Sequence, residues 1–170
     1  MAKRIQLEVT TPEGIKLQAE VDEVTLPSVH GEFGVLPEHR PLLAGLRSGI
    51  VSFVDGKQVQ VLAIGPGFAR VAEDRVSILT VHFMKKDEVD PVIARKDLKE
   101  MEAELSALGE SAPEEERLRL LAAVRWAAVR LELYGDPPPP TMLLAHEVPL
   151  MGHEDYTGLD AEPSGQEPVI

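Results

Sequence analysis

Between Ser28 and Arg40 the chain carries its densest group of side chains that could do chemistry. Two histidines and two carboxylates fall in this stretch, namely His30, Glu32, Glu38 and His39. Imidazole and carboxylate groups bind metal ions or transfer protons when they converge on one point. Their spacing alone does not fix that geometry, because glycine and proline punctuate the stretch. Three interpretations are open: a metal or catalytic site, a solvated loop, or a loop that contacts a partner protein.

Other motifs of enzymes and nucleotide-binding proteins are absent or incomplete. Gly65-Pro-Gly67 begins like a dinucleotide-binding fingerprint, but Arg70 occupies the sixth position and a strand pattern follows where a helix is required. The tripeptide instead predicts a turn or bulge at which two strands need backbone freedom. The sequence contains no phosphate loop, no nucleophile elbow, no His-Glu-x-x-His motif and no cysteine. We therefore expect no catalytic residues, no metal site and no cofactor.

Basic and apolar residues alternate along the second of two predicted helices. The cations are Arg117, Arg119, Arg125 and Arg130, and Trp126 lies beside the apolar stripe. One interpretation is a solvated face that pairs with acidic residues of the first helix. The other is a face that docks on an acidic partner surface, because charges around an apolar stripe steer and register docking. Trp126 would stabilise whichever state buries it.

The overall composition excludes several classes of protein. Seventeen Lys and Arg face 29 Asp and Glu, for a formal net charge of −12. That charge would repel a phosphate backbone, so we expect no nucleic-acid partner. No apolar signal-peptide segment opens the chain, and no stretch approaches 18 consecutive apolar residues. We therefore expect a soluble chain that is not inserted directly into a membrane.

The apolar residues of the first zone, residues 1–86, recur at a period of two, which is typical of strands. Asp55-Gly56 suits the two φ > 0 positions of a type I′ hairpin turn, and a second tight turn is predicted at Glu73-Asp74. No helical period separates the strands to make parallel crossovers. The zone therefore predicts an antiparallel β-sandwich or barrel.

The second zone, residues 87–135, changes to a helical period. Asp90-Pro91 places a preferred N-cap before the first helix, and Ser111 with Glu114 resembles a capping box for the second. The predicted apolar stripes comprise Leu98, Met101, Leu105 and Leu108 on the first helix, and Leu120 or Leu121, Val124, Ala128 and Leu131 on the second. A short connection makes the helices an antiparallel hairpin, which must dock on another surface because isolated helices are marginal.

The third zone, residues 136–170, is an acidic, proline-rich tail. It has seven prolines, seven acidic residues and no Lys or Arg. This composition predicts a polyproline start followed by largely disordered chain. Two short apolar segments, residues 142–145 and 148–151, are the parts of the tail that could contact something.

Three short signatures in the first zone carry a family resemblance. Gly31-Glu-Phe-Gly-Val-Leu-Pro-Glu-His39, then Pro41-Leu-Leu43, then Leu46-Arg-Ser-Gly-Ile50 resemble the epsilon subunit of the F-type, proton-translocating ATP synthase. That family shows Gly-Glu-Leu-Gly-Ile, a Pro-x-His, a Pro-Leu-Leu and a later Pro-Gly-hydrophobic segment in the same order. Its members have an N-terminal β-sandwich followed by a two-helix hairpin, the layout predicted here for residues 1 to about 135.

The resemblance implies a non-catalytic rotor subunit of the central stalk. Its sandwich would join the gamma subunit to the polar loops of the membrane-embedded c-ring. The contact role falls on Glu32, surrounded by Gly31, Phe33, Gly34 and His39, which favours the partner-contact interpretation of this stretch. An exposed ion pair of Glu32 would contribute only about 0–1 kcal/mol. Most of the affinity is therefore expected from the sandwich face that meets gamma.

The resemblance also implies a regulatory role for the two helices. In the family the hairpin lies folded on the sandwich or extends along gamma into the catalytic alpha/beta head, where it blocks ATP hydrolysis. Some bacterial members bind ATP through Ile/Leu-Asp-x-x-Arg-Ala at the start of the first helix. Asp90 and Ala94 match this motif, but Ile93 replaces the arginine, and Arg95 comes one position late, about 100° around the helix. We therefore expect no ATP binding.

Two hypotheses from other functional classes remain beside the rotor subunit. One is an unrelated β-sandwich binding module whose hairpin dimerises, whereas an isolated epsilon subunit is expected to be a monomer. The other is a small hydrolase or lyase that uses His30, Glu32, Glu38 and His39. No Arg- and Ser-rich transit segment precedes the first predicted strand, which favours a bacterial protein. By the family resemblance, its place would be the cytoplasmic face of the inner membrane, attached through partners.

Overall fold

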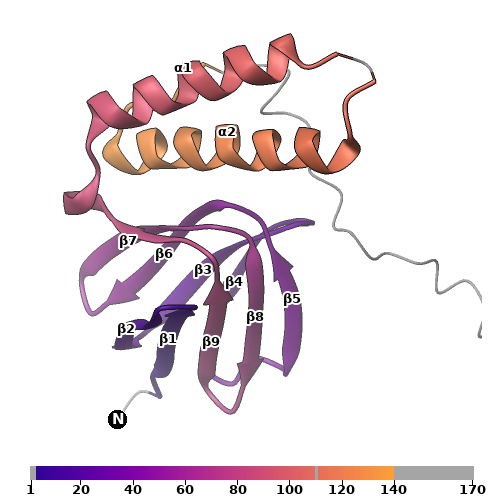
Figure 1. Cartoon of the computed structure of the whole chain (residues 1–170). Helices are drawn as coiled ribbons and strands as arrows, with labels where there is room; N and C mark the ends of the chain where they lie inside the picture. The colour runs from indigo at the N-terminus through magenta and orange to yellow at the C-terminus, as the bar shows by residue number, and fades with distance from the viewer. Residues whose placement is uncertain (1–2, 110, 140–170) are drawn as a thin grey trace, which may run out of the picture.

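The structure is a computed structural model, and it describes residues 3–109 and 111–139. In these residues ten strands precede a short 3₁₀-helix and two α-helices (Figure 1). The strands are β1 Ile5–Thr11, β2 Gly14–Val21, β3 Glu23–Ser28, β4 Gly31–Val35, β5 Leu42–Leu46, β6 Gly49–Asp55, β7 Gln58–Ile64, β8 Gly67–Ala72, β9 Arg75–Thr80 and β10 Phe83–Lys85. The helices are η1 Lys86–Glu88, α1 Pro91–Ala107 and α2 Glu114–Tyr134. The predicted β-sandwich followed by a helical hairpin is confirmed. Most of the predicted tail lies outside the described residues.

The strands are hydrogen-bonded in the order β10-β7-β6-β3-β5-β8-β9-β1-β2, and β4 pairs with β3. Eight of the nine pairings are antiparallel, as predicted, but β1 and β9 pair in parallel. These two strands are far apart in the sequence, so no hairpin turn forces them into opposite directions. The alternating pattern within each strand carries no information about that partner.

The two predicted hairpin turns have different outcomes. Glu73 and Asp74 both have positive φ, 53° and 56°, so the tight turn predicted there is present, and it has the type I′ pattern. The other turn lies one residue later than predicted, because Asp55 still pairs with Gln58 across the ladder. Its loop is Gly56-Lys57, and only Gly56 has a positive φ, 62°. The backbone amide of Gly56 donates to the carboxylate of Asp22, at 2.7 Å, which holds the turn against a neighbouring strand end.

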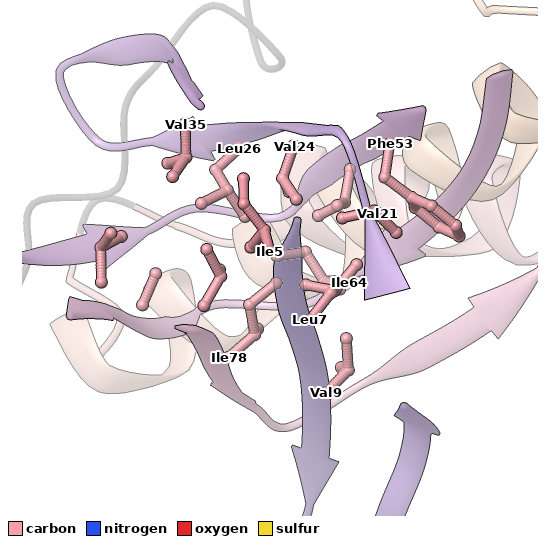
Figure 2. Close-up of a cluster of buried hydrophobic side chains, with 14 of the residues drawn as sticks. Ile5, Leu7, Val9, Val21, Val24, Leu26, Val35, Phe53, Ile64 and Ile78 are labelled. Atoms are coloured by element: carbon pink, nitrogen blue, oxygen red, sulfur yellow. The ribbon is translucent and has the colours of Figure 1, made fainter. Parts of the chain in front are cut away.

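The core of the sandwich lies between the two layers of strands. Figure 2 shows branched aliphatic side chains from both layers converging in this core. The fully buried members include Ile5, Leu7 and Val9 from β1, with Val24 and Leu26 from β3. They occupy every second position, as the period of two requires. Removing this apolar surface from water is the main source of stability of the domain.

The first helix begins as predicted, and the second does not. The Asp90 carboxylate accepts hydrogen bonds from the amides of Val92 and Ile93, at 2.9 and 3.1 Å, so Asp90 is a true N-cap. The capping box predicted at Ser111 and Glu114 is wrong, because α2 starts at Glu114 after Pro113 with no side-chain cap. The Pro113 carbonyl instead accepts from two amides of the first turn. Acidic residues 114–116 then stabilise the helix, because their negative charges lie at the positive end of the helix dipole.

The helices form a hairpin with its own core, and α2 lies between α1 and the sandwich (Figure 1). Both predicted apolar stripes meet in this core, which contains Leu98, Leu105, Leu120, Val124, Ala128 and Leu131. A separate and smaller cluster joins α2 to the sandwich, with Val129 and Leu133 against Ala63. Ile50, Met84, Val89 and Trp126 pack around it. The hairpin is thus docked on β6 and β7 through a few side chains.

Candidate functional site

Glu32 lies on an exposed β-hairpin rather than in an irregular loop. Gly31, at φ 119°, opens β4, and the Ser28 hydroxyl accepts from the His30 amide, at 3.1 Å. In the ladder Glu32 lies opposite Pro27 and Phe33 opposite Leu26. Phe33 is half-buried against the sandwich core, whereas Gly31, Glu32 and Gly34 are exposed. The fold therefore presents the Glu32 carboxylate to solvent on a rigid support.

The four candidate acid–base residues do not form one site. His30 and Glu32 lie at the start of β4, whereas Glu38 and His39 follow its far end. Glu38 pairs with Lys3, and His39 Nδ1 lies 2.8 Å from the Arg40 carbonyl oxygen. Among the described residues no group of three or more His, Cys, Asp or Glu is placed to hold a metal ion. The hydrolase or lyase hypothesis thus has no converging site behind it.

The predicted partner-docking residues of α2 lie in different environments. Arg117 is half-buried and lies 3.8 Å from Glu114, while Arg119 is exposed. Arg125 lines a groove between α2 and the sandwich. Arg130, only 14% exposed, donates to Asp97 of α1 at 2.7 Å, and its Nε is buried without a hydrogen-bond partner. In this state Arg130 serves the contact between the helices.

Trp126 stacks on a histidine of the sandwich. The rings of Trp126 and His82 are 4.9 Å apart and inclined by 24°. Gly65 lies behind the histidine, since a Cβ there would be 3.0 Å from His82 Cβ and Cδ2. Partial burial, and secondarily the positive charge of Arg130, lower the pKa of His82 below its ordinary value. The sequence analysis gave no sign of this contact.

A row of exposed apolar side chains crosses the outer face of one sheet, and sequence reasoning missed it. The ladder places Phe68 beside Leu79, Leu79 beside Thr10, and Thr10 beside Ile15. Phe68, Leu79 and Ile15 are 55–59% exposed. Two residues after Phe68 on β8, Arg70 lies opposite Ser77 of β9 and Leu43 of β5. This apolar row, defined by Ile15, Phe68 and Leu79, has no covering element in the described residues, which is typical of a protein-binding surface.

The candidate nucleotide-binding positions at the start of α1 serve the helix itself. The Asp90 carboxylate caps α1, and Ala94 is fully buried in the helix-to-helix core. Arg95, near the start of α1, pairs with Asp136, which follows the end of α2. Ile93 is 52% exposed at the position of the motif's arginine. These positions thus offer no free cation for a phosphate.

Among the described residues no helix is long and apolar enough to cross a membrane. Residues 4–86 match the family model for the beta-sandwich domain of the ATP synthase delta/epsilon chain. "ATP synthase epsilon chain 2" of Syntrophotalea carbinolica is 38% identical over 135 residues, which cover 79% of this chain and 96% of that protein. The epsilon chain of Herpetosiphon aurantiacus is 38% identical over 76% of this chain and 93% of that protein.

Solved structures give the same match in space. A chain of the mitochondrial ATP synthase of Euglena gracilis is 28% identical, with a TM-score of 0.62 over 73% of this chain and 77% of that one. A chain from the central stalk and c-ring of the Tetrahymena thermophila mitochondrial ATP synthase is 10% identical, with a TM-score of 0.52 over 78% of this chain and 98% of that one. The second likeness supports the fold alone.

Proposed function

The chain belongs to the epsilon chain family of ATP synthases, and we propose that it is a non-catalytic subunit of the rotor. In this role it couples the gamma subunit to the c-ring and regulates ATP hydrolysis through α1 and α2. It has no active site of its own, and we expect no ATP to bind at the start of α1. Because the chain belongs to this family, the alternative of an unrelated binding module with a dimerisation hairpin is not favoured.

The observation that carries the proposal is the exposed apolar row on the outer sheet face. Its three large side chains lie on β8, β9 and β2 of one hydrogen-bonded sheet, with β1 between β9 and β2, so binding orders little that is not already ordered. A partner that covers Ile15, Phe68 and Leu79 removes apolar surface from water, which is the main source of affinity in such contacts. Arg70 beside the row adds a cation that fixes the register of a partner carboxylate. We assign this surface to gamma.

The Glu32 hairpin supplies the second contact, to the polar loops of the c-ring. Glu32 is exposed at the start of β4, with Gly31 and Gly34 adding no side chains that would block an approaching loop. A basic group of the ring would pair with Glu32, and His39 beyond the other end of β4 borders the same strand. Such an exposed ion pair contributes about 0–1 kcal/mol, so its main effect is to orient the c-ring loop on the sandwich rather than to add affinity.

The hairpin supplies the regulation. It has its own core and is held to the sandwich by a small cluster, so it can leave the sandwich without unfolding. When released, α2 exposes Trp126, Val129 and Leu133, flanked by Arg119 and Arg125, to the alpha/beta head. The isolated chain is a monomer with the hairpin docked. In the cell the protein is held at the cytoplasmic face of a bacterial membrane through its partners.

The experiment is ATP hydrolysis by a purified alpha-beta-gamma core, titrated with the full chain. We expect inhibition that saturates near one equivalent, and none from a version ending at Lys86 that still binds. Phe68→Ser with Leu79→Ser should abolish binding, because a polar pair replaces the centre of the apolar row. Val59→Ser is the matched control, since Val59 is 68% exposed on the opposite sheet. Binding that survives the double change would refute the assigned surface.

A further inference from the structure

A groove runs between α2 and the turn that joins β5 to β6. On the helix side it is lined by Arg125, Ala128, Val129 and Glu132, which share one face of α2. The sandwich side is formed by residues 47–50, with Pro27 and Glu32. The groove has a volume of about 170 Å³. Pro137 and Pro138, which follow α2, line it as well.

The chain is turned into this groove at the end of α2. Gly135 adopts φ 106°, and its amide and that of Asp136 both donate to the Leu131 carbonyl, at 3.1 and 3.0 Å. These bonds reverse the chain direction, as in a Schellman C-cap. Asp136 then pairs with Arg95 at the start of α1, which fixes the exit of the chain. Pro138 is half-buried where it meets the groove.

We propose that residues 137–139 after α2 are a strap, which lies in the groove at Pro137 and Pro138 and holds the hairpin on the sandwich. Pro137 and Pro138 line the groove together with residues of α2 and of the sandwich, so undocking separates them from the sandwich side. Two prolines have few conformations to lose, which lowers the entropic cost of lying there. The regulatory use of the strap rests on the proposed function.

Two cations, Arg47 and Arg125, and two carboxylates, Glu32 and Glu132, line the groove. Their charges balance, so net charge does not hold the strap there. The S. carbinolica relative is covered almost to its full length by 135 residues of this chain, so about a fifth of the chain has no counterpart in it. The strap is therefore an addition to the domain plan that the relative represents.

The test is the rate at which a buried thiol becomes accessible in the full-length chain. The chain has no cysteine, so Leu133→Cys places a single thiol in the cluster between α2 and the sandwich, where Leu133 is 3% exposed. At fixed pH its labelling rate follows the population of the undocked state. Pro137→Gly with Pro138→Gly should raise the rate roughly tenfold, which corresponds to about 1.4 kcal/mol. Pro163→Gly with Pro168→Gly is the matched control and should leave the rate unchanged.

Labelling within twofold of the starting protein in both double variants would overturn the strap. If circular dichroism shows that the Pro137 and Pro138 variant has unfolded, Arg95→Gln tests the same strap through its tie to Asp136. That variant should also label faster, and an unchanged rate would count against the proposal. These measurements need no catalytic core. With the core, the strap variant should inhibit hydrolysis at a several-fold lower concentration, whereas a core that binds no form of the chain would refute the rotor assignment alone.

Discussion

Gly67→Ala should destabilise the sandwich, because β8 and β9 approach too closely at Gly67 to admit a side chain. A Cβ there would lie 1.9 Å from the carbonyl oxygen of Leu79 and 2.9 Å from Thr80 Cα. Both are backbone atoms, so no flexible side chain can move aside. To bring the new Cβ to even 3.0 Å from the Leu79 carbonyl oxygen, which would lie at 1.9 Å, the backbone must shift by 1.1 Å. The two strands must therefore separate.

The size of the effect follows from the ladder between the strands. A ladder bond of about 2.9 Å that lengthens by this shift reaches about 4 Å, which is no longer a hydrogen bond. Two such losses at about 0.5–1.5 kcal/mol each, with packing strain of about 1–3 kcal/mol, predict a loss of about 2–6 kcal/mol. Urea unfolding followed by circular dichroism of the strands measures it as a lower midpoint at an unchanged slope.

Gly34→Ala is the matched control on β4. A Cβ at Gly34 would meet only the Glu23 carboxylate, at 3.8 Å, which is an ordinary contact. Alanine also restricts the unfolded chain more than glycine does, so this variant should be neutral or more stable by up to about 1 kcal/mol. The reasoning fails if Gly67→Ala unfolds within about 0.5 kcal/mol of the starting protein, or if the two variants lose equal stability.

Three further predictions concern the hairpin and its contact with the sandwich. Asp90→Ala should cost about 1 kcal/mol by removing the cap on Val92 and Ile93, as measured by hydrogen exchange in the first turn of α1. Leu120→Ala should cost about 2–5 kcal/mol of hairpin stability in thermal unfolding, because Leu120 is 4% exposed in the helix-to-helix core. His82 should titrate in an NMR experiment with a pKa below the ordinary value of about 6.5, and Arg130→Gln should raise that pKa. Because docking lowers the pKa of His82, its contribution to docking is full above about pH 6.5 and declines as the pH falls below that value; an ordinary pKa for His82 would contradict this.

The sequence predicted those features whose cause is local in the chain. The alternation along β1 predicted which of its residues are buried, and Asp90-Pro91 predicted the first residue of α1. Glu73-Asp74 predicted a tight turn, and both residues have positive φ in the structure. The register of the other hairpin depended on a side chain from elsewhere, since the Gly56 amide donates to Asp22. A local pattern could not show that bond, and the turn was placed one residue early.

The features that sequence reasoning missed arise where distant segments meet. Ile15, Phe68 and Leu79 form one row only because β1 pairs in parallel with β9, which no hairpin dictates. The Gly65-Pro-Gly67 segment was interpreted as a turn or bulge that needs backbone freedom. The structure shows a different need at both glycines, since His82 crowds Gly65 and the β9 backbone crowds Gly67. Glycine here is required for space rather than for a positive φ.

The separation of the apolar cores explains how one fold can be both a fixed connector and a switch. Within residues 3–109 and 111–139, the sandwich core and the hairpin core share no residue, and the cluster that joins them has only Ala63, Val129 and Leu133 as buried members. Unfolding either core exposes far more apolar surface than undocking does, so undocking is the opening of lowest free energy. The apolar row and the Glu32 hairpin both belong to the sandwich, which does not change when the hairpin leaves. The sandwich can therefore stay bound to its partners while α2 moves. The few side chains around Trp126, together with the strap, set how often α2 undocks.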